Sequence, residues 1–225
     1  MFKNLTEDKK KLWLVIGATV VLIIAIVVVI VFLVKENNVV SGIGNINPDA
    51  KKVKNEYEQL NGTVSEDDKT YPYVDISSNN ILRYTDVTEI LDIFDNSGDA
   101  VIYFGYSSCL YCRSVIQVLC DTASSTSLDK IYYLNVEEVS HDDNYNKLVD
   151  ILGEAFTIDV NGQKEIYSPL VLFVVNGNVV SYNKGTLFSQ EDPYVELDDY
   201  QVEGLSEIYR YGINDVLDSM RIKNQ

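Results

Sequence analysis

Two cysteines, Cys109 and Cys112, stand where a short apolar run gives way to a helix-like pattern. The stretch 99–105 before them is typical of a buried strand, and apolar residues then recur at helical spacing as far as Leu119. Thiol–disulfide exchange requires such a dithiol at the start of a helix, because free N–H groups and the helix dipole favour the thiolate of the first cysteine. The second sulfur, one turn further on, can close a ring with the first. We therefore expect Cys109 and Cys112 to form a redox-active pair.

Strands and helices are expected to alternate around this pair. Alternating elements pair their strands in parallel, and a closing hairpin adds antiparallel strands at the far side. The sequence therefore predicts an α/β fold in which one mixed β-sheet has helices on both faces. The expected strands are 71–76, 100–105, 131–136, 170–175 and 178–182, with a hairpin at 156–166 and helices at about 48–61, 87–97, 109–123, 145–152 and 213–220.

The run from Leu12 to Val34 contains no charged residue. As a helix it would be about 34 Å long, enough to cross the bilayer core of about 30 Å. A cleavable signal peptide would have a shorter apolar region that ends in small residues, so we expect a retained transmembrane helix. Four lysines precede the run and only Lys35 follows it closely, which places the N-terminus in the cytoplasm. The expected organisation is a cytoplasmic tail (1–11), a transmembrane helix (12–34), a stalk with a short helix (35–70) and an extracytoplasmic domain (71–225).

The chain has a net charge of −16 at pH 7, with 34 acidic and 18 basic residues. An acidic exterior argues against binding to nucleic acid and against lying flat on anionic lipid. The chain contains three cysteines, all after position 108, which are too few for a disulfide framework in a domain of this size. This pattern fits an extracytoplasmic protein with one working dithiol and one spare thiol.

A second motif follows the cysteines by about 55 residues: Ser168-Pro169, the apolar run 170–173 and the turn at 176–177. Together with the sequence 103–113, it gives the chain a resemblance to the thioredoxin superfamily. Within that superfamily the chain resembles the membrane-anchored thioredoxin-like proteins of Gram-positive bacteria, including those called bacteriocin transport accessory proteins. The resemblance covers about residues 71–222 and implies a thioredoxin fold.

The resemblance also implies the roles of the two cysteines. Cys109 would be the exposed nucleophile, and Cys112 would resolve the mixed disulfide, with no cofactor. The reduction potential of such a pair depends on how far the thiolate of Cys109 is stabilised. Leu110 and Tyr111 occupy the first helical turn against this sulfur, so we expect them to tune the potential.

Pro169 matches the cis-proline of the superfamily, which faces the dithiol and exposes the preceding backbone, here that of Ser168, for pairing with a substrate. An X-Pro bond is cis in only about 5–6% of cases, so a trans proline at the start of an edge strand stays open from the residues alone. The chain departs from familiar thioredoxins at four positions, two of which are Leu110 and Tyr111, where those proteins have a Gly-Pro pair between the cysteines. Ser108 replaces a tryptophan, and Tyr103 replaces a buried aspartate thought to help deprotonate the resolving thiol.

These features predict a membrane-anchored thiol–disulfide oxidoreductase that acts outside the cytoplasmic membrane on thiols and disulfides of exported proteins or peptides. An unidentified membrane redox partner would exchange electrons with it. The alternative is a non-catalytic thioredoxin-fold module that assists export of bacteriocin-type peptides. The intact dithiol favours the enzyme, and the missing aspartate and tryptophan favour the module.

Several other residues have less specific interpretations. Cys120 follows Cys109 at about 16 Å along the helix axis, too far for a disulfide, so we expect a buried free thiol. Three cysteines and His141 would be enough ligands for a zinc ion. Because Cys120 lies so far from the other two cysteines, however, we expect no metal site. Arg113 either adds positive charge near the sulfurs or, as we prefer, lies on the solvent face. The acidic run 190–200 is interpreted as a solvated loop, with partner docking as the alternative.

Overall fold

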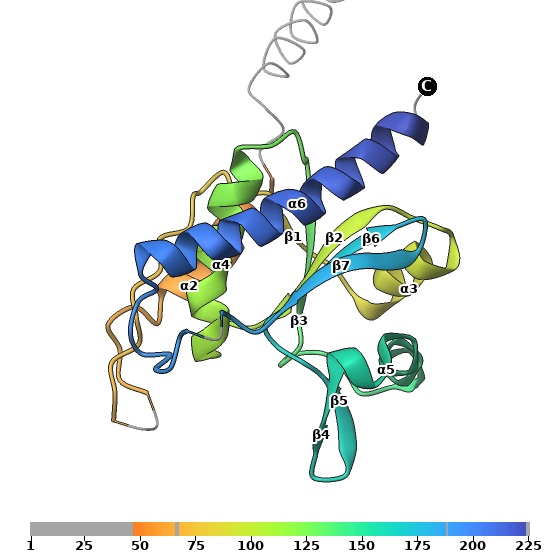
Figure 1. Ribbon diagram of the computed structural model, residues 1–225. Coiled ribbons are helices and arrows are strands. Elements are labelled where there is room, and N and C mark those ends of the chain that lie inside the picture. The colour runs from red at the N-terminus through yellow and green to blue at the C-terminus, as the bar shows by residue number, and fades with distance from the viewer. Residues whose placement is uncertain (1–46, 66–67, 188, 224–225) are drawn as a thin grey trace, which may run out of the picture. The chain divides into compact units, whose positions relative to one another are not determined.

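A computed structural model describes residues 47–65, 68–187 and 189–223 of the chain (Figure 1). Residues from Asn47 onward form one compact unit. The expected cytoplasmic tail (1–11) and transmembrane helix (12–34) lie outside the described residues. Among the helices within the described ranges, none has the length and apolar character needed to cross a membrane.

The compact unit is built on a five-stranded mixed sheet in the order β1-β3-β2-β6-β7. Strands β1 (Leu82–Tyr84), β3 (Ile131–Asn135) and β2 (Ala100–Gly105) are parallel to one another. Strands β6 (Leu170–Val175) and β7 (Asn178–Lys184) continue the sheet in antiparallel pairs. Strand β2 is buried along its whole length, because helices cover both of its faces.

Helices lie on both faces of the sheet (Figure 1). One face packs against α2 (Ala50–Glu58), α4 (Leu110–Ser124) and α6 (Asp199–Lys223). The other face packs against α3 (Val87–Asp95) and α5 (Asp143–Phe156). This arrangement confirms the α/β fold class that the alternating pattern predicts, a mixed sheet with helices on both faces.

The strand predicted at 71–76 is wrong, and the first strand is instead β1. Pro72 lacks a backbone N–H, and two of the backbone N–H groups that follow it donate to side chains and not to another strand. The backbone N–H groups of Val74 and Ile76 donate to the side chains of Asn61 and Glu58, at 3.0 and 2.9 Å. Side chains therefore make the hydrogen bonds to this extended backbone that a neighbouring strand was expected to make.

Helix α2, which the sequence analysis assigned to the stalk, packs into the domain. Val53 and Tyr57 of this helix have no exposed surface and belong to the core beside α4 and α6. The compact unit therefore begins at Asn47, earlier than position 71 where the sequence analysis placed the domain boundary. The segment before β1 is part of the folded unit.

The predicted hairpin at 156–166 is confirmed, and it forms a separate two-stranded sheet of β4 (Thr157–Val160) and β5 (Gln163–Ile166). Its turn uses Asn161 and Gly162, both with positive φ. This turn chemistry is the one that two-residue hairpins favour. Helix α6 begins well before the predicted C-terminal stripe.

Candidate functional site

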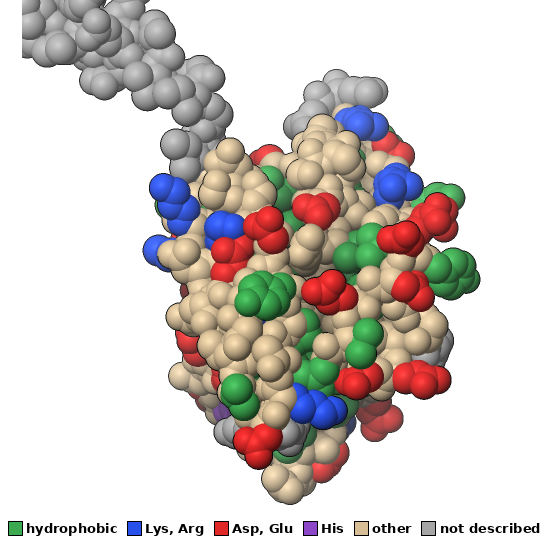
Figure 2. Space-filling model, turned by 90° about the vertical axis from the view of Figure 1, so that its left-hand side faces the viewer, with side chains coloured by type: hydrophobic (Ala, Val, Ile, Leu, Met, Phe, Trp, Pro, Cys, Tyr) green, Lys and Arg blue, Asp and Glu red, His purple; other side chains and the backbone are tan. Residues whose placement is uncertain are grey.

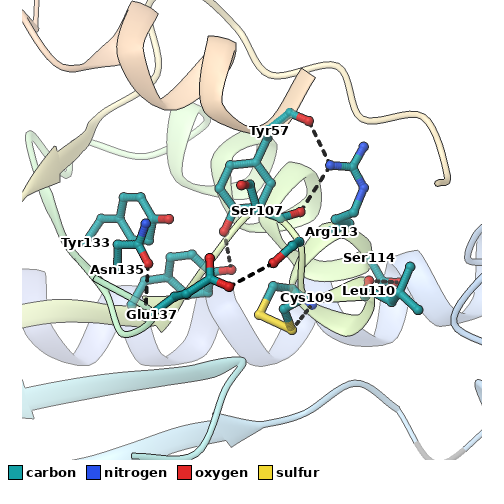
Figure 3. The surroundings of a disulfide bond; sticks show 12 residues. Tyr57, Ser107, Cys109, Leu110, Arg113, Ser114, Tyr133, Asn135 and Glu137 are labelled. Atoms are coloured by element: carbon teal, nitrogen blue, oxygen red, sulfur yellow. Dashed lines mark hydrogen bonds between the residues drawn. A yellow bond between two sulfur atoms is a disulfide. The ribbon is translucent and has the colours of Figure 1, made fainter. Parts of the chain in front are cut away.

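Cys109 and Cys112 are joined by a disulfide, with their Cα atoms 5.1 Å apart (Figure 3). Cys109 is the N-cap residue of α4, and its sulfur accepts a hydrogen bond from the backbone N–H of Cys112 at 3.1 Å. Cys109 is half-buried, whereas Cys112 has no exposed surface. A sulfur that accepts from a free N–H at a helix start is favoured as an anion once the disulfide opens.

The strand before the cysteines and the helix after them hold the pair in place. Strand β2 is central in the sheet and delivers the chain to the turn 106–108. A side chain at Gly105 would collide with the phenol of Tyr103, so the last position of the strand requires glycine. The buried residues of α4 then anchor the helix on the sheet, and they include Val115, Ile116 and Leu119.

Ser168 and Pro169 lie beside the cysteine turn. In the antiparallel pair of β2 and β6, Leu170 is opposite Phe104, which brings the residues just before Leu170 to the end of β2 where the turn begins. The Ser168–Pro169 peptide bond is cis, as the resemblance implied. The side chain of Ser168 is near enough to the phenol of Tyr106, within the turn, to lower its pKa against the larger opposing effect of burial. The structure thus brings these two residues together with the cysteines.

The two residues between the cysteines form the first turn of α4. Leu110 is half-buried and Tyr111 is 39% exposed. Both residues therefore lie next to the N-cap sulfur, in the turn from which the sequence analysis expected them to tune the reduction potential.

A carboxylate that sequence reasoning missed lies next to the cysteine turn. The hydroxyl of Ser108 donates to Glu137 at 3.3 Å, and the backbone N–H of Glu137 donates to the side chain of Asn135 at 3.1 Å (Figure 3). Burial, followed by the charge of Glu137, raises the pKa of Tyr106. Glu137, which follows β3 in the chain, therefore adds negative charge next to the cysteine turn.

Arg113 is buried, with 2% of its surface exposed, so the preferred solvent-face interpretation is wrong. Its Nη1 atom donates to the carbonyl oxygens of Tyr57 at 2.7 Å and Ser107 at 3.3 Å. Its Nη2 atom donates to Asn61 Oδ1 at 2.6 Å and to the carbonyl oxygen of Pro72 at 2.7 Å. Burial lowers the pKa of this guanidinium. The spacing of Arg113 in the sequence could have indicated this burial, because a residue three positions before the buried Ile116 faces the same side of a helix.

A group of buried phenols lies on the same face of the sheet. Tyr103, which the resemblance matches to a buried aspartate, has its hydroxyl 3.0 Å from that of Tyr57. Its ring stacks on Tyr133, with centroids 5.3 Å apart. Tyr133 in turn donates to Glu56 at 2.7 Å, and Tyr84 donates to the other oxygen of that carboxylate. Burial raises the pKa of Glu56, against the opposing effect of these two hydrogen bonds.

A cavity of about 540 Å³ lies beside α4, between the segment 58–75 and the start of α6. Figure 2 shows this side of the molecule, where acidic side chains are interspersed with apolar ones. Four carboxylates and several apolar side chains line the cavity. They are Glu58, Asp75, Asp121 and Glu196, with Pro72, Tyr73, Val74, Val118, Leu197 and Val202.

Two further predicted residues lie apart from the dithiol chemistry. Cys120 is a buried free thiol, as predicted, and burial raises its pKa. His141 is exposed, stacks on Tyr145 and contacts Gln163 through Nδ1 at 2.6 Å. Within the described ranges, no group of three or more potential His, Cys, Asp or Glu ligands is placed to hold a metal ion.

The acidic run at 190–200 contacts the rest of the domain. Tyr194 hydrogen-bonds to Ser65 at 2.8 Å and lies under Lys69. Gln190 is buried and donates to Ser114 of α4 at 2.9 Å. The run is therefore partly packed, although its carboxylates are exposed as the solvated-loop interpretation expects.

No known family model matches this chain, and no curated protein matches it either. The chemistry must therefore be argued from the geometry of the site. That geometry is a half-buried sulfur at a helix start, a fully buried sulfur bonded to it, and a proline loop that leads into β6 beside the end of β2.

Proposed function

We propose that this protein is a thiol–disulfide oxidoreductase with a thioredoxin-like fold, anchored in the membrane by residues 12–34 and acting outside it. The observation that carries the proposal is the unequal placement of the two bonded sulfurs. Cys109 is half-buried at the N-cap of α4, and Cys112 is fully buried. Only the first sulfur can meet a thiol of another polypeptide without a rearrangement of the helix.

The reaction that this placement supports is a two-step exchange. A substrate thiolate attacks the sulfur of Cys109, and Cys112 leaves as a thiolate that takes up a proton. A second substrate thiol loses its proton and attacks the substrate sulfur of the mixed disulfide, which releases Cys109. Cys109 is released as a thiolate, so two electrons and one proton pass from the substrate dithiol to the protein and the second proton goes to solvent. The reverse sequence reduces a substrate disulfide.

Three features support this proposal beyond the dithiol itself. The element order and the mixed sheet fit the thioredoxin fold that the resemblance implies. Ser168 and Pro169 lie beside the cysteine turn, where the resemblance expects them to pair with an extended substrate chain. The membrane anchor would keep the site close to newly exported polypeptides.

One observation favours the second candidate, a non-catalytic thioredoxin-fold module that assists peptide export. Tyr103 replaces the superfamily's buried aspartate, and its hydroxyl pairs with that of Tyr57. A phenol whose pKa burial raises well above 10 is a poor base for the resolving thiol.

A trapping experiment tests the choice between these candidates. In cells that produce full-length Cys112→Ser protein, Cys109 should accumulate mixed disulfides with exported polypeptides, visible as adducts that a reductant removes. The matched control is Cys109→Ser, in which the remaining buried sulfur should trap none. The purified wild-type protein should also oxidise a reduced test protein or reduce insulin. Absence of adducts together with absence of both activities would exclude the catalytic proposal.

A further inference from the structure

Arg113 is a buried cation without an acidic partner among the described residues. None of the ion pairs in the described ranges includes its guanidinium, although 34 acidic residues are present in the chain. All its hydrogen-bond acceptors are neutral oxygens, from three backbone carbonyls and one amide. Neutral acceptors solvate a cation but leave its net charge in place, and a charge acts over longer distances in a poorly hydrated interior than in water.

The position of this charge relates it to the dithiol. Arg113 directly follows Cys112 in α4, and its Nη1 atom donates to the carbonyl oxygen of Ser107, two residues before Cys109. Figure 3 shows Ser107 between the guanidinium and the cysteine turn. The other acceptors of the guanidinium belong to the segment 57–72, so this side chain also ties that segment to the turn.

The other groups around the turn are acidic or uncharged at neutral pH. Glu137, which follows β3, reaches the turn through Ser108, and Glu165 of β5 acts on the phenol of Tyr106. The ring of Tyr71 lies against the guanidinium, with its centroid 5.4 Å from Arg113 Cζ. The two carboxylates disfavour a thiolate at Cys109, and Arg113 favours it.

We propose that Arg113 is a positioning residue whose buried, unneutralised charge stabilises the thiolate of Cys109 and thereby makes the dithiol a stronger oxidant. The inference rests on the proposed thiol–disulfide exchange and concerns its direction. When a substrate dithiol reduces the Cys109–Cys112 bond, two electrons and one proton pass to the pair and the second substrate proton goes to solvent, so Cys109 is left as a thiolate and its stabilisation favours this reduced product. Arg113 itself neither bonds to sulfur nor transfers a proton.

The test compares full-length variants in which charge and hydrogen bonding change separately. Arg113→Met removes the charge, and Arg113→Lys keeps it. Asn61→Asp places a carboxylate against Nη2 and neutralises the guanidinium in place. Asn61→Ala removes the same amide, with its bonds to Arg113 and Val74, but leaves the positive charge intact. For each protein, the oxidised fraction is measured in glutathione buffers, and the thiolate absorbance of the reduced form is followed against pH.

Arg113→Met and Asn61→Asp should each lower the equilibrium constant for reduction of the disulfide about tenfold, which is about 30 mV. The pKa of Cys109 should rise by about one unit in the same two variants. Arg113→Lys and Asn61→Ala should stay within about threefold of the wild type, which is about 15 mV. If Arg113→Met does not fold, the Asn61 pair decides the question by itself.

Equal constants for Asn61→Asp and Asn61→Ala would overturn the inference, whether both match the wild type or both shift. The glutathione equilibrium is a property of the dithiol alone and does not depend on finding a substrate. Failure here would therefore leave the trapping result untouched. Conversely, failure of trapping would not hide an effect of Arg113 on the potential.

Discussion

Helices α3 and α5 cover one face of the sheet with a mainly aliphatic core, whereas α2, α4 and α6 cover the other face with a core that contains several phenols, the disulfide, a free thiol and a guanidinium. We refer to these as the aliphatic face and the polar face. The alternation of side chains along β2 separates them, because Ile102 and Phe104 point to the aliphatic face and Val101 and Tyr103 to the polar face.

The two faces differ in what they require of their neighbours. Aliphatic burial is non-directional and needs only well-packed volume. Each buried polar group needs a partner in a defined direction, and an unmatched group costs about 1–3 kcal/mol. On the polar face, several of these partners come from α2 and the segment that follows it: Glu56, Tyr57 and Asn61. The face that holds the dithiol is therefore the one that depends on residues outside the alternating pattern.

Truncation on the aliphatic face should have the largest effect on stability and none on redox chemistry. Leu148 of α5 has no exposed surface, so Leu148→Ala should lower the free energy of unfolding by about 2–5 kcal/mol. The reduction potential should remain that of the wild type. Denaturant unfolding and glutathione equilibration of the full-length chain measure the two quantities.

Ile151→Ala, on the exposed side of the same helix, is the matched control and should change stability by less than about 0.5 kcal/mol. A shift in potential for Leu148→Ala would mean that the two faces are coupled through β2. The separation into independent faces would then be wrong.

A substitution on the polar face should lower the free energy of unfolding by less, and the loss should depend on pH. Glu56 accepts hydrogen bonds from Tyr84, Tyr133 and Asn135, so Glu56→Gln should cost about 1–3 kcal/mol at pH 7. Burial raises the pKa of Glu56 above its ordinary 4.5, which means that the folded state binds this proton more tightly than the unfolded chain. The stability from this proton is fully present below pH 4.5 and falls as the pH rises through the raised folded value.

The stability difference between the wild type and Glu56→Gln should therefore widen as the pH is lowered through that window, which unfolding curves at several pH values can follow. Glu154→Gln is the control, because Glu154 is exposed at the end of α5. Its stability should stay within about 0.5 kcal/mol of the wild type. A pH-independent difference for Glu56→Gln would show that this carboxyl is not held in a buried environment.

The aliphatic face is also the part of the fold that the sequence predicts well. The helix expected at 87–97 is confirmed by α3, where the side chain of Asp86 accepts from the backbone N–H of Glu89. The helix pattern that starts at 145 is confirmed by α5, and Gly153 interrupts it with φ of +64°. Apolar periodicity and helix caps depend on residues close together in the chain, so they can be recognised in a single sequence.

The polar face was less predictable, because its contacts join residues far apart in the chain. The disulfide and its place at the helix start followed from local spacing. The buried site of Arg113 did not, since the carbonyl oxygens that bind it belong to residues 57 and 72. The error at 71–76 has the same origin, because the side chains that satisfy this segment come from Glu58 and Asn61. Apolar periodicity carries no information on such side chain–backbone pairings.

Cys120 offers the smallest and most selective test of the polar face. Its thiol is buried in the same core as Tyr103 and Cys112, but it is free, and burial raises its pKa so that it stays protonated. Cys120→Ala should therefore cost only about 1 kcal/mol, close to the loss of one buried methylene-sized group. It should leave both the potential of the Cys109–Cys112 pair and its mixed disulfides unchanged, as measured by glutathione equilibration and by the trapping experiment. If either of them changed, the third thiol would take part in the exchange, and the polar face would contain a redox group beyond the first turn of α4.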